Sequence, residues 1–479
     1  MCHRLEALLK VFKEKKLRSY PASRDEPAVS SALEWTPDNT AAALKGCAFD
    51  QHLGLKLYHE DPLPLIESAC ALAGCQFLDH EFLVHPSATV SIAGSPGLAP
   101  GIITNSNAED LGGSGDSKRM ARVEEFVDRA AKRWRWVRGH SLGHYYSLFS
   151  SPKSIDARNV IQGQVGNCGF CSGFSSLALF PDLIATALKA NKTCGAVSVR
   201  LFPKGGGVGR ERWLLMDDFV IVNKFGKESP SLHSLVDGDL WIRFLEKVFV
   251  KIQSSYASLD GFYKYNSLYR HPGRALGLLT GGFAFEMNHE GGGECFAALV
   301  ATQAFCCARV AHCREASSGL YSNHGYSLLW IGEVCDGLRL CCLRNPHGRR
   351  SFTGRFGWGV DSWNGVDDEV IEALLEVGCF FEEVDGAAAP VEGGCLGGKV
   401  KSTSGNRRVV WQGGRAGASV DDGVFLIEFD VFARCFPILT IVNIFDGGPV
   451  LDNHNVVRKL EPGDVHVVPE LLELLASRR

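Results

Sequence analysis

The sequence lacks the long apolar runs and the charge excess that would assign it to a membrane or to nucleic acid. No stretch of the 479 residues approaches the ~18 apolar residues that a membrane span needs. The formal net charge is −4, from 50 basic and 54 acidic residues, which does not favour an RNA or DNA partner. Lys10 and Lys13 interrupt the first apolar stretch, so we expect a short amphipathic helix there rather than a signal peptide.

Cysteine, by contrast, is abundant, with 17 residues. A long chain without a secretory signal is expected to keep its cysteines as thiols in a reducing compartment, so we predict a cytoplasmic, intracellular protein. Several cysteines lie inside apolar runs, among them Cys341 and Cys342, where a thiol behaves as a small hydrophobe. We therefore expect one or two of the cysteines at most to carry chemistry.

The chain is too long for one compact core, which predicts two to four packed units. Ser91–Ser117 is rich in Gly, Ser, Pro and Asn and predicts a flexible insert. Helical periodicity is clear in LWIRFLEKVFVKIQSSYASL, where Trp241, Leu245, Val248 and Ile252 share one face. A second helix is expected at about Glu294–Arg314.

The pattern changes after about residue 320. YSLLWIGEV and LRLCCLRN are strand-like and are separated by Asp336-Gly337, a strong hairpin signal. DGVFLIEFDVFARCF and LTIVNIF predict further strand and helix pieces. With no internal repeat, helices before about residue 260 and strands after about 320, the sequence predicts a two-lobed α+β protein.

The segment QGQVGNCGFCSGF contains a candidate nucleophile. Gly163 and Gly166 precede Cys168, and Phe170 and Phe174 begin an apolar helical pattern, so Cys168 is expected in the first turn of a helix. The helix dipole there favours the thiolate, which is the reactive species of cysteine. The side chain of Gln162 and the Cys168 N–H are candidate donors to an oxyanion.

Two other interpretations of Cys168 remain open. It is a buried structural cysteine, or it forms a redox CxxC with Cys171. The redox motif requires a preceding buried strand, and the turn-rich SIDARNVIQGQVGN disfavours one.

His324 opens the first strand of the predicted hairpin and Asn345 ends the second. Ideal pairing sets Asn345 opposite about Leu328, roughly 13 Å along the strand from His324, so a bulge or a longer turn is required to bring the two together. A base bonded to the thiol and a third group that holds its tautomer are the requirements of nucleophilic cysteine catalysis. The order Gln162, Cys168, His324, Asn345 fits them.

These segments resemble the calpain protease core over about residues 64–447. QGQVGNC resembles the nucleophile segment, NHGYSLL the histidine segment and LRNPHG the asparagine segment of that family, and CQFLDHEF and DGVFLIEFDVFARCF resemble the two ends of its core. The resemblance implies a two-lobed papain-like fold and a cysteine endopeptidase acting on proteins or peptides at few sites. It also implies an intracellular enzyme that is typically activated by calcium.

The chain departs from the family in two groups of positions. The usual Trp after the nucleophile is Gly169, and the Trp that shields the histidine–asparagine bond is His347. Of the calcium-site acids that the resemblance implies, Asp422 remains and Asp237 neighbours a position occupied by Val236, but the others are replaced by Asn159, Ser351 and Val424. We therefore expect a core whose calcium sites are eroded, with no certain cofactor and no EF-hand loop.

Three other motifs favour core packing or loops. Cys306, Cys307, His312 and Cys313 fit no zinc-ligand spacing. The basic and aromatic residues of Arg133–His140 predict a helix end rather than an RNA contact. KGGGVGRER lacks the Lys-Ser/Thr of a phosphate-binding loop.

The sequence therefore predicts four segments: an extension at 1–62, a first lobe at 63–261 with Gln162 and Cys168, a second lobe at 262–447 with His324 and Asn345, and a tail at 448–479. The expected function is proteolysis through an acyl-enzyme. The alternative is a weakly active or inactive calpain-like scaffold. The sequence leaves the substrate and the oligomeric state open.

Overall fold

The computed structural model describes many separate stretches of the chain, which include both halves of the candidate site. They are residues 34–35, 47–50, 53, 55–79, 82, 134–143, 146–151, 154–203, 211–223, 231–253, 259, 272–288, 296, 299, 304–310, 319–321, 324–335, 337–348, 352–357, 365–376, 381–384, 408–411 and 423–443. The predicted N-terminal helix, the insert at 91–117 and the tail lie outside these residues.

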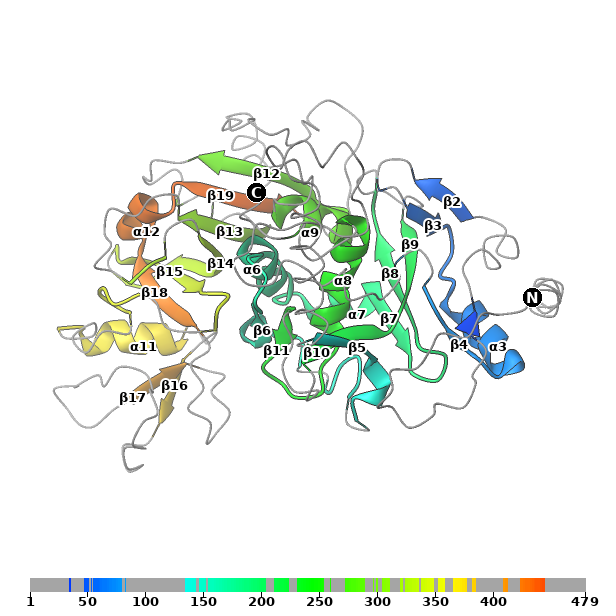
Figure 1. The fold of residues 1–479 in the computed structure, drawn as a ribbon. Coiled ribbons are helices and arrows are strands. Elements are labelled where there is room, and N and C mark those ends of the chain that lie inside the picture. Colours follow the sequence, from blue (N-terminus) through cyan, green and yellow to red (C-terminus); the bar gives the residue numbers. More distant parts are fainter. Residues whose placement is uncertain are drawn as a thin grey trace, which may run out of the picture.

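A six-stranded sheet with the order β12-β19-β13-β14-β15-β18 dominates the C-terminal part (Figure 1). Its strands are antiparallel to their neighbours. They are β12 (Phe283–Asn288), β13 (Ala304–Val310), β14 (His324–Glu333), β15 (Arg339–Arg344), β18 (Val424–Glu428) and β19 (Ile438–Asn443).

Alternation along β15 and β18 gives this sheet two buried faces. Cys341, Leu343, Phe425 and Ile427 join one apolar cluster with α12 (Phe429–Cys435). Leu340, Cys342, Val424 and Leu426 join another with Val370 and Leu374 of α11 (Asp368–Glu376). The sheet that carries the predicted hairpin is therefore covered on both sides, which makes its register hard to shift.

A five-stranded sheet with the order β2-β3-β9-β8-β7 lies in the N-terminal part. Its strands are β2 (Cys47–Asp50), β3 (Leu55–Tyr58), β7 (Leu188–Asn191), β8 (Ala196–Leu201) and β9 (Arg212–Asp217). Four two-stranded pairs accompany the large sheets: β1 (Glu34–Trp35) with β4 (Gln76–Phe77), β5 (Trp134–Arg138) with β10 (Phe219–Asn223), β6 (Val160–Ile161) with β11 (His233–Ser234), and β16 (Phe381–Val384) with β17 (Arg408–Trp411).

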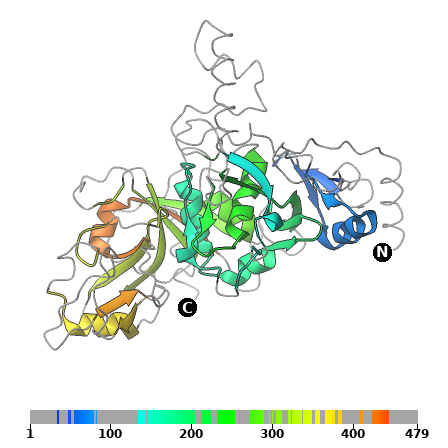
Figure 2. The same ribbon diagram turned by 60° about the horizontal axis from the view of Figure 1, so that its bottom comes forward.

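The described residues contain five further α-helices and two 3-10 turns. They are α3 (Leu63–Ala73), α6 (Cys168–Leu177), α7 (Pro181–Ala187), α8 (Trp241–Gln253), α9 (Pro272–Thr280) and the 3-10 turns η2 (Gly139–Ser141) and η3 (Ala157–Asn159). In both views α6 and α8 lie between the sheets and α3 lies at the outer edge (Figures 1 and 2). Residues of α6, α8 and α9 share one large buried cluster with β8, β9 and β10.

Several helix and strand predictions are confirmed and three are wrong. The helix at 241–253, the hairpin β14–β15 and the pieces β18, α12 and β19 form as predicted. Residues 304–310 form β13 instead of a helix, because β14 and β19 pair with it on both sides. The end of the helix predicted at Arg133–His140 is β5, which pairs with β10. Among the described residues before 260, helices do not dominate either, since these residues contain the five-stranded sheet.

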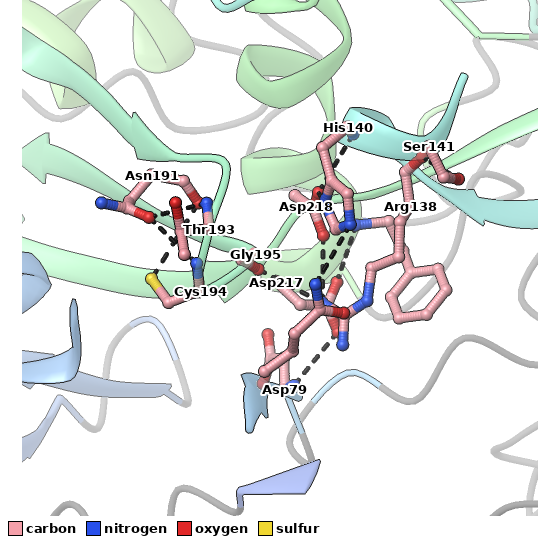
Figure 3. Close-up of polar contacts among 12 residues, drawn as sticks. Asp79, Arg138, His140, Ser141, Asn191, Thr193, Cys194, Gly195, Asp217 and Asp218 are labelled. Carbon is pink, nitrogen blue, oxygen red and sulfur yellow. Dashed lines mark hydrogen bonds and ion pairs between the residues drawn. The ribbon is translucent and has the colours of Figure 1, made fainter. Parts of the chain in front are cut away.

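Buried ion pairs attach α8 to the N-terminal sheet. Lys251 Nζ lies 2.8 Å from Asp79 Oδ2, and Lys247 pairs with Asp217 at the end of β9. The Asp79 N–H donates to Asp217 Oδ2 at 3.0 Å (Figure 3). A second network beside it joins Arg138 and His140 to Asp218 at 3.0 and 2.6 Å. These contacts fix α8, which lies behind the candidate site.

No single helix of the described residues is long and apolar enough to cross a membrane. Helices α6 and α7 pass that test only when taken together, and they are bent by 103° relative to each other.

Candidate active site

Cys168 is the first residue of α6, as the sequence predicts. Asn167 precedes it as the N-cap, and its carbonyl accepts the Cys171 N–H at 3.1 Å. The first turn of α6 contains no acidic residue, so the positive end of the helix dipole acts on Cys168 without a nearby carboxylate on the same turn. The Cys168 side chain is partly exposed, which leaves a thiol at this position accessible.

Hydrogen bonds attach α6 to the β14–β15 hairpin along its length. Ser327 Oγ of β14 donates to the Ser172 carbonyl at 2.8 Å, and Arg344 Nη1 of β15 donates to Ser175 Oγ at 2.9 Å. All four of these residues are buried. The contacts therefore hold the nucleophile helix and the hairpin in one rigid arrangement.

Gly325 brings the start of β14 against the start of α6. A methyl group added at its Cα would lie 3.4 Å from both the carbonyl carbon and the carbonyl oxygen of Cys168, and 3.2 Å from Ser172 Oγ. Glycine allows this close approach because it has no Cβ. His324 is the neighbour of Gly325 in the chain, so the packing of Gly325 brings the backbone at the candidate base close to the first turn of the nucleophile helix.

His324 and Asn345 are hydrogen-bonded, with 2.9 Å between His324 Nε2 and Asn345 Oδ1. The register explains how the hairpin brings them together. Arg344 pairs with Ser327, and a bulge shifts the register between Leu328 and Trp330. The sequence required such a bulge or a longer turn, and both contribute: the register of the turn and the bulge at Leu329 each shift the pairing by one residue, which sets Asn345 opposite about Tyr326 instead of Leu328.

The tautomer of His324 follows from the contacts of Asn345. Asn345 Oδ1 also accepts the backbone N–H of His347 at 3.1 Å, which identifies this atom as the amide oxygen. His324 Nε2 must then carry the proton that it donates to Asn345, and Nδ1 retains a lone pair. That lone pair is the acceptor that a general base needs.

Aromatic rings enclose His324, whose residue is 6% exposed. The rings of Tyr321, Tyr326 and His347 lie 5.7, 5.0 and 4.4 Å from its ring, centroid to centroid. His347 thus occupies a shielding position over the His324–Asn345 pair, where the family resemblance leads one to expect Trp. Burial and the charge of His347 lower the pKa of His324 to about 4, against the hydrogen bond to Asn345, which raises it.

Gln162 is attached to the Asn345 segment through its backbone. Its N–H donates to the Pro346 carbonyl at 2.8 Å. Its side-chain Nε2 donates to the Val165 carbonyl at 2.8 Å, and its Oε1 is buried without a hydrogen-bond partner. One amide hydrogen of Gln162 is used by Val165, which leaves the other for the oxyanion role that the sequence predicts.

Asn167 and Glu246 form a contact behind the nucleophile that the sequence analysis did not identify. Asn167 Nδ2 donates to Glu246 Oε1 at 2.6 Å, and Glu246 Oε2 accepts the Leu232 N–H at 3.0 Å. Glu246 is fully buried, and burial raises its pKa to about 8 against these hydrogen bonds, which lower it. Burial thus favours the protonated, neutral form of Glu246 against the N-cap of α6. The apolar periodicity of α8 in the sequence does not indicate that Glu246 is buried or that it contacts Asn167.

The redox interpretation of Cys168 and Cys171 is tested by the surroundings of Cys171 and by the strand before α6. Cys171 is buried in the interior of α6, and its thiol faces the carbonyl oxygens of Val160 and Pro346 at 3.9 and 3.8 Å. The strand that precedes α6, β6, has two residues, which is too short for the central strand of a thioredoxin-like unit. The redox interpretation of this motif has no support from the fold.

The predicted calcium ligands Asp237 and Asp422 do not lie in a ligand cluster among the described residues. Asp237 lies in an exposed turn before α8, and Asp422 lies outside the described residues. No group of three His, Cys, Asp or Glu side chains among the described residues is arranged to hold a metal ion. The two acids therefore remain a prediction, and no chemical step below depends on a metal.

Comparison with known proteins matches residues 117–386 of the chain to the family model for calpain family cysteine proteases. Human calpain-12 is 27% identical over 278 residues, which cover 53% of this chain and 36% of that protein. A calpain of Schistosoma mansoni is 25% identical over 282 residues, 54% of this chain and 35% of its own length. The calpain-type cysteine protease ADL1 of Oryza sativa subsp. japonica is 27% identical over 233 residues, 44% of this chain and 10% of its own. The matched region thus spans between a tenth and about a third of each relative.

Proposed function

The chain belongs to the calpain family of cysteine proteases, and on that premise we propose that it is an intracellular endopeptidase that cleaves proteins through a thioester on Cys168. The observation that carries the proposal is the 2.9 Å bond between His324 Nε2 and Asn345 Oδ1, in a hairpin that packs Gly325 on the backbone of Cys168. A nucleophile, a base and an orienting amide are the parts that this chemistry needs. The proposal includes the catalytic roles of Gln162, Cys168, His324 and Asn345. It also includes the acyl-enzyme and a two-lobed papain-like fold.

In the first half of the reaction, Cys168 Sγ attacks the carbonyl carbon of the scissile peptide while His324 Nδ1 takes the thiol proton. The carbonyl oxygen becomes an oxyanion, to which Gln162 Nε2 and the Cys168 N–H donate. His324 then gives its proton to the leaving nitrogen, and the C–N bond breaks. The products are an amine and a Cys168 thioester.

In the second half, water attacks the thioester carbon and His324 takes one of its protons. The C–S bond breaks, and the proton returns to Cys168 Sγ as the acid product leaves. Asn345 keeps the same His324 tautomer throughout. A pKa of about 4 keeps His324 neutral in the resting enzyme, so it acts as a base that takes the thiol proton during attack.

The alternative function is a weakly active or inactive calpain-like scaffold that binds partners in place of substrate. The replacement of Trp by Gly169 and His347 and the eroded calcium acids favour it. The aromatic enclosure of His324 by Tyr321, Tyr326 and His347 favours the enzyme, since it excludes water from the His324–Asn345 bond.

A thiol-directed epoxysuccinyl probe distinguishes the two functions. Purified protein is incubated with the probe, with and without calcium, and the labelled peptide is identified by mass spectrometry. We expect the label on Cys168 and its loss in Cys168→Ala. Folded protein that takes no label at Cys168 in either condition would favour the scaffold, and a calcium-dependent label would reveal an ion site.

A further inference from the structure

Three cysteines outside the candidate active site lie together at the outer edge of the molecule. Cys70 is in the last turn of α3, Cys75 follows the helix end, and Cys194 lies in the turn between β7 and β8 (Figure 3 shows Cys194). They belong to one buried cluster and are 2%, 6% and 2% exposed. The sequence separation of more than 100 residues means that folding, not chain proximity, brings Cys194 to the other two.

The helix end of α3 sets the distance between Cys70 and Cys75. Gly74 adopts a left-handed conformation with φ 63°, and the Cys75 N–H returns to the Cys70 carbonyl at 3.1 Å. With standard bond lengths this hydrogen bond limits the Cα–Cα separation to about 7 Å or less. Disulfides require Cα atoms no farther apart than about 7 Å, so this pair meets the requirement.

Backbone contacts hold Cys194 against the segment that follows Cys75. The Phe77 N–H, two residues after Cys75, donates to the Cys194 carbonyl at 2.7 Å. Asn191 Oδ1 accepts the N–H groups of both Thr193 and Cys194 at 2.9 Å, which fixes the turn (Figure 3). The backbone of Cys194 is thus attached to the strand that begins beside Cys75.

Cys70 interacts with both neighbouring thiols, and hydrogen bonding among them shifts the pKa of all three. The Cys70 thiol donates, so its own pKa is raised, and the pKa values of Cys75 and Cys194 are lowered by that bond against their burial. Thiolates are the attacking species in disulfide exchange, and the bond from Cys70 favours that form at Cys75 and Cys194 while their burial opposes it.

A metal site is the other use that three cysteines suggest. Three thiolates must converge on one point about 2.3 Å from each sulfur to bind zinc. No group of three metal-ligating side chains in the described part of the chain does so. The three thiols interact as two pairs, Cys70 with Cys75 and Cys70 with Cys194, and this pairing favours a disulfide bond over a metal site.

We propose that Cys70, Cys75 and Cys194 form a thiol-oxidation site in which Cys70 makes a reversible disulfide with Cys75 or Cys194. The oxidant is a low-molecular-weight disulfide such as oxidised glutathione. The Cys75 thiolate, which is the most exposed of the three, attacks one sulfur of that disulfide and releases one thiolate. The Cys70 sulfur then loses its proton, attacks Cys75 Sγ and releases the second. Two protein thiols are oxidised and one small disulfide is reduced to two thiols.

Access to this site requires only a local opening. Helix α3 is 11 residues long and lies at the edge of the molecule in both ribbon views, and Leu72 beside Cys70 is 56% exposed. Edge elements with one packed face open locally at a lower free-energy cost than the core. The opening of α3 does not require movement of Cys168 or His324, which lie on α6 and β14.

The test uses the full chain, oxidised glutathione at graded ratios to reduced glutathione, and alkylation of the remaining thiols after denaturation. We expect a disulfide that maps to Cys70 with Cys75 or Cys194, unchanged circular dichroism, and complete reversal by dithiothreitol. Cys70→Ala removes both products, and Cys75→Ala leaves only the Cys70–Cys194 bond. Cys435→Ala is the matched control, since Cys435 is 3% exposed in the other core and its loss leaves the disulfide unchanged.

Alkylation of all three cysteines to the same extent in oxidised and reduced protein would overturn the proposal. So would a Cys75–Cys194 disulfide, because Cys70 is the member common to both contacts. Oxidation that occurs only together with loss of the folded circular dichroism signal would also overturn it. Labelling of Cys168 by the epoxysuccinyl probe is a separate readout, so failure of this site and failure of the proposed proteolysis are distinguishable.

Discussion

The oxygen of the Asn345 side chain accepts two hydrogen bonds, from His324 Nε2 and from the His347 N–H. Both bonds act on the same oxygen, so a rotation of the amide would lose both. The orientation of the His324 ring therefore depends on a group that is itself fixed by the backbone. This arrangement positions the base before substrate binds, which is how active sites avoid the cost of reorganisation.

Asn345→Ala should lower kcat/KM for a protein substrate about 10²-fold, because His324 loses the acceptor that fixes its tautomer and orientation. The iodoacetamide reaction rate of Cys168 should fall with it, which a purely structural effect on stability would not produce. Asn191→Ala is the matched control, since Asn191 Oδ1 also accepts two backbone N–H groups but lies in the β7–β8 turn. Equal kcat/KM losses in the two variants would contradict the assignment.

His347 adds a second imidazole next to the base, 4.4 Å away between ring centroids. The charge of a protonated His347 lowers the pKa of His324, so an uncharged ring at this position should raise it. We expect His347→Phe to move the acid limb of the kcat/KM–pH profile to higher pH by about half a unit or more. Tyr321→Phe, which keeps a ring beside His324 and changes no charge, should leave the limb in place. A shift to lower pH in His347→Phe would contradict this account.

Among the elements, α6 and the β14–β15 hairpin are the pair that assembles the site. The sequence predicted both of them, since the glycines before Cys168 and the Asp336-Gly337 turn are local signals. It also required the irregularity that the bulge at Leu329 provides. It did not reveal β13, because an apolar run of seven residues fits a helix or a buried strand equally well until its partners are known.

Gly325→Ala tests the contact between these two elements. The added methyl would lie in ordinary contact with backbone atoms of Cys168 at 3.4 Å, and Ser172 Oγ at 3.2 Å would have to give way by a few tenths of an ångström. We expect a loss of about tenfold in kcat/KM with little change in thermal stability. Gly337→Ala is a control that strains the backbone without adding a contact. Gly337 has a φ of 81°, which strains an alanine, and no atom lies within 4 Å of the added methyl. This variant should lower the stability and leave kcat/KM of the folded enzyme unchanged. An unaffected Gly325→Ala enzyme would show that the contact does not position His324.

At the scale of the whole molecule, a line of buried polar contacts joins the N-terminal sheet to the nucleophile. Asp79 and Asp217 bind Lys251 and Lys247 of α8, and Glu246 of the same helix holds Asn167. Composition and periodicity predicted α8 and its apolar face, but not these contacts, because each depends on a partner that is distant in sequence. The limits of the two lobes, predicted at 63–261 and 262–447, remain predictions.

Glu246 should make the stability of the whole fold depend on pH. Its pKa in the folded protein is about 8, raised above the ordinary 4.5, so the stabilisation is present below pH 4.5 and is lost as the pH rises toward 8. Between pH 5 and pH 8 the free energy of unfolding of the wild type should fall relative to Glu246→Gln by about 3–4 kcal/mol. Urea unfolding at several pH values measures this difference.

Glu369→Gln, at an exposed position of α11, is the control for removal of a carboxylate. Its unfolding free energy should follow the wild-type pH dependence. Parallel pH profiles for the wild type and Glu246→Gln would mean that Glu246 is ionised in the folded protein and would contradict its role as a neutral support for α6.

The most direct test of the central claim is turnover of a fluorescently labelled unfolded protein by the purified chain, compared with Cys168→Ala. The account predicts fragments from the wild type, none above background from Cys168→Ala, and a thioester at Cys168 that is trapped by rapid acid quenching. Fragments produced equally by both proteins would contradict the assignment of Cys168. A folded wild type that takes the epoxysuccinyl label but produces no fragments under any calcium concentration would contradict the proposed proteolysis itself.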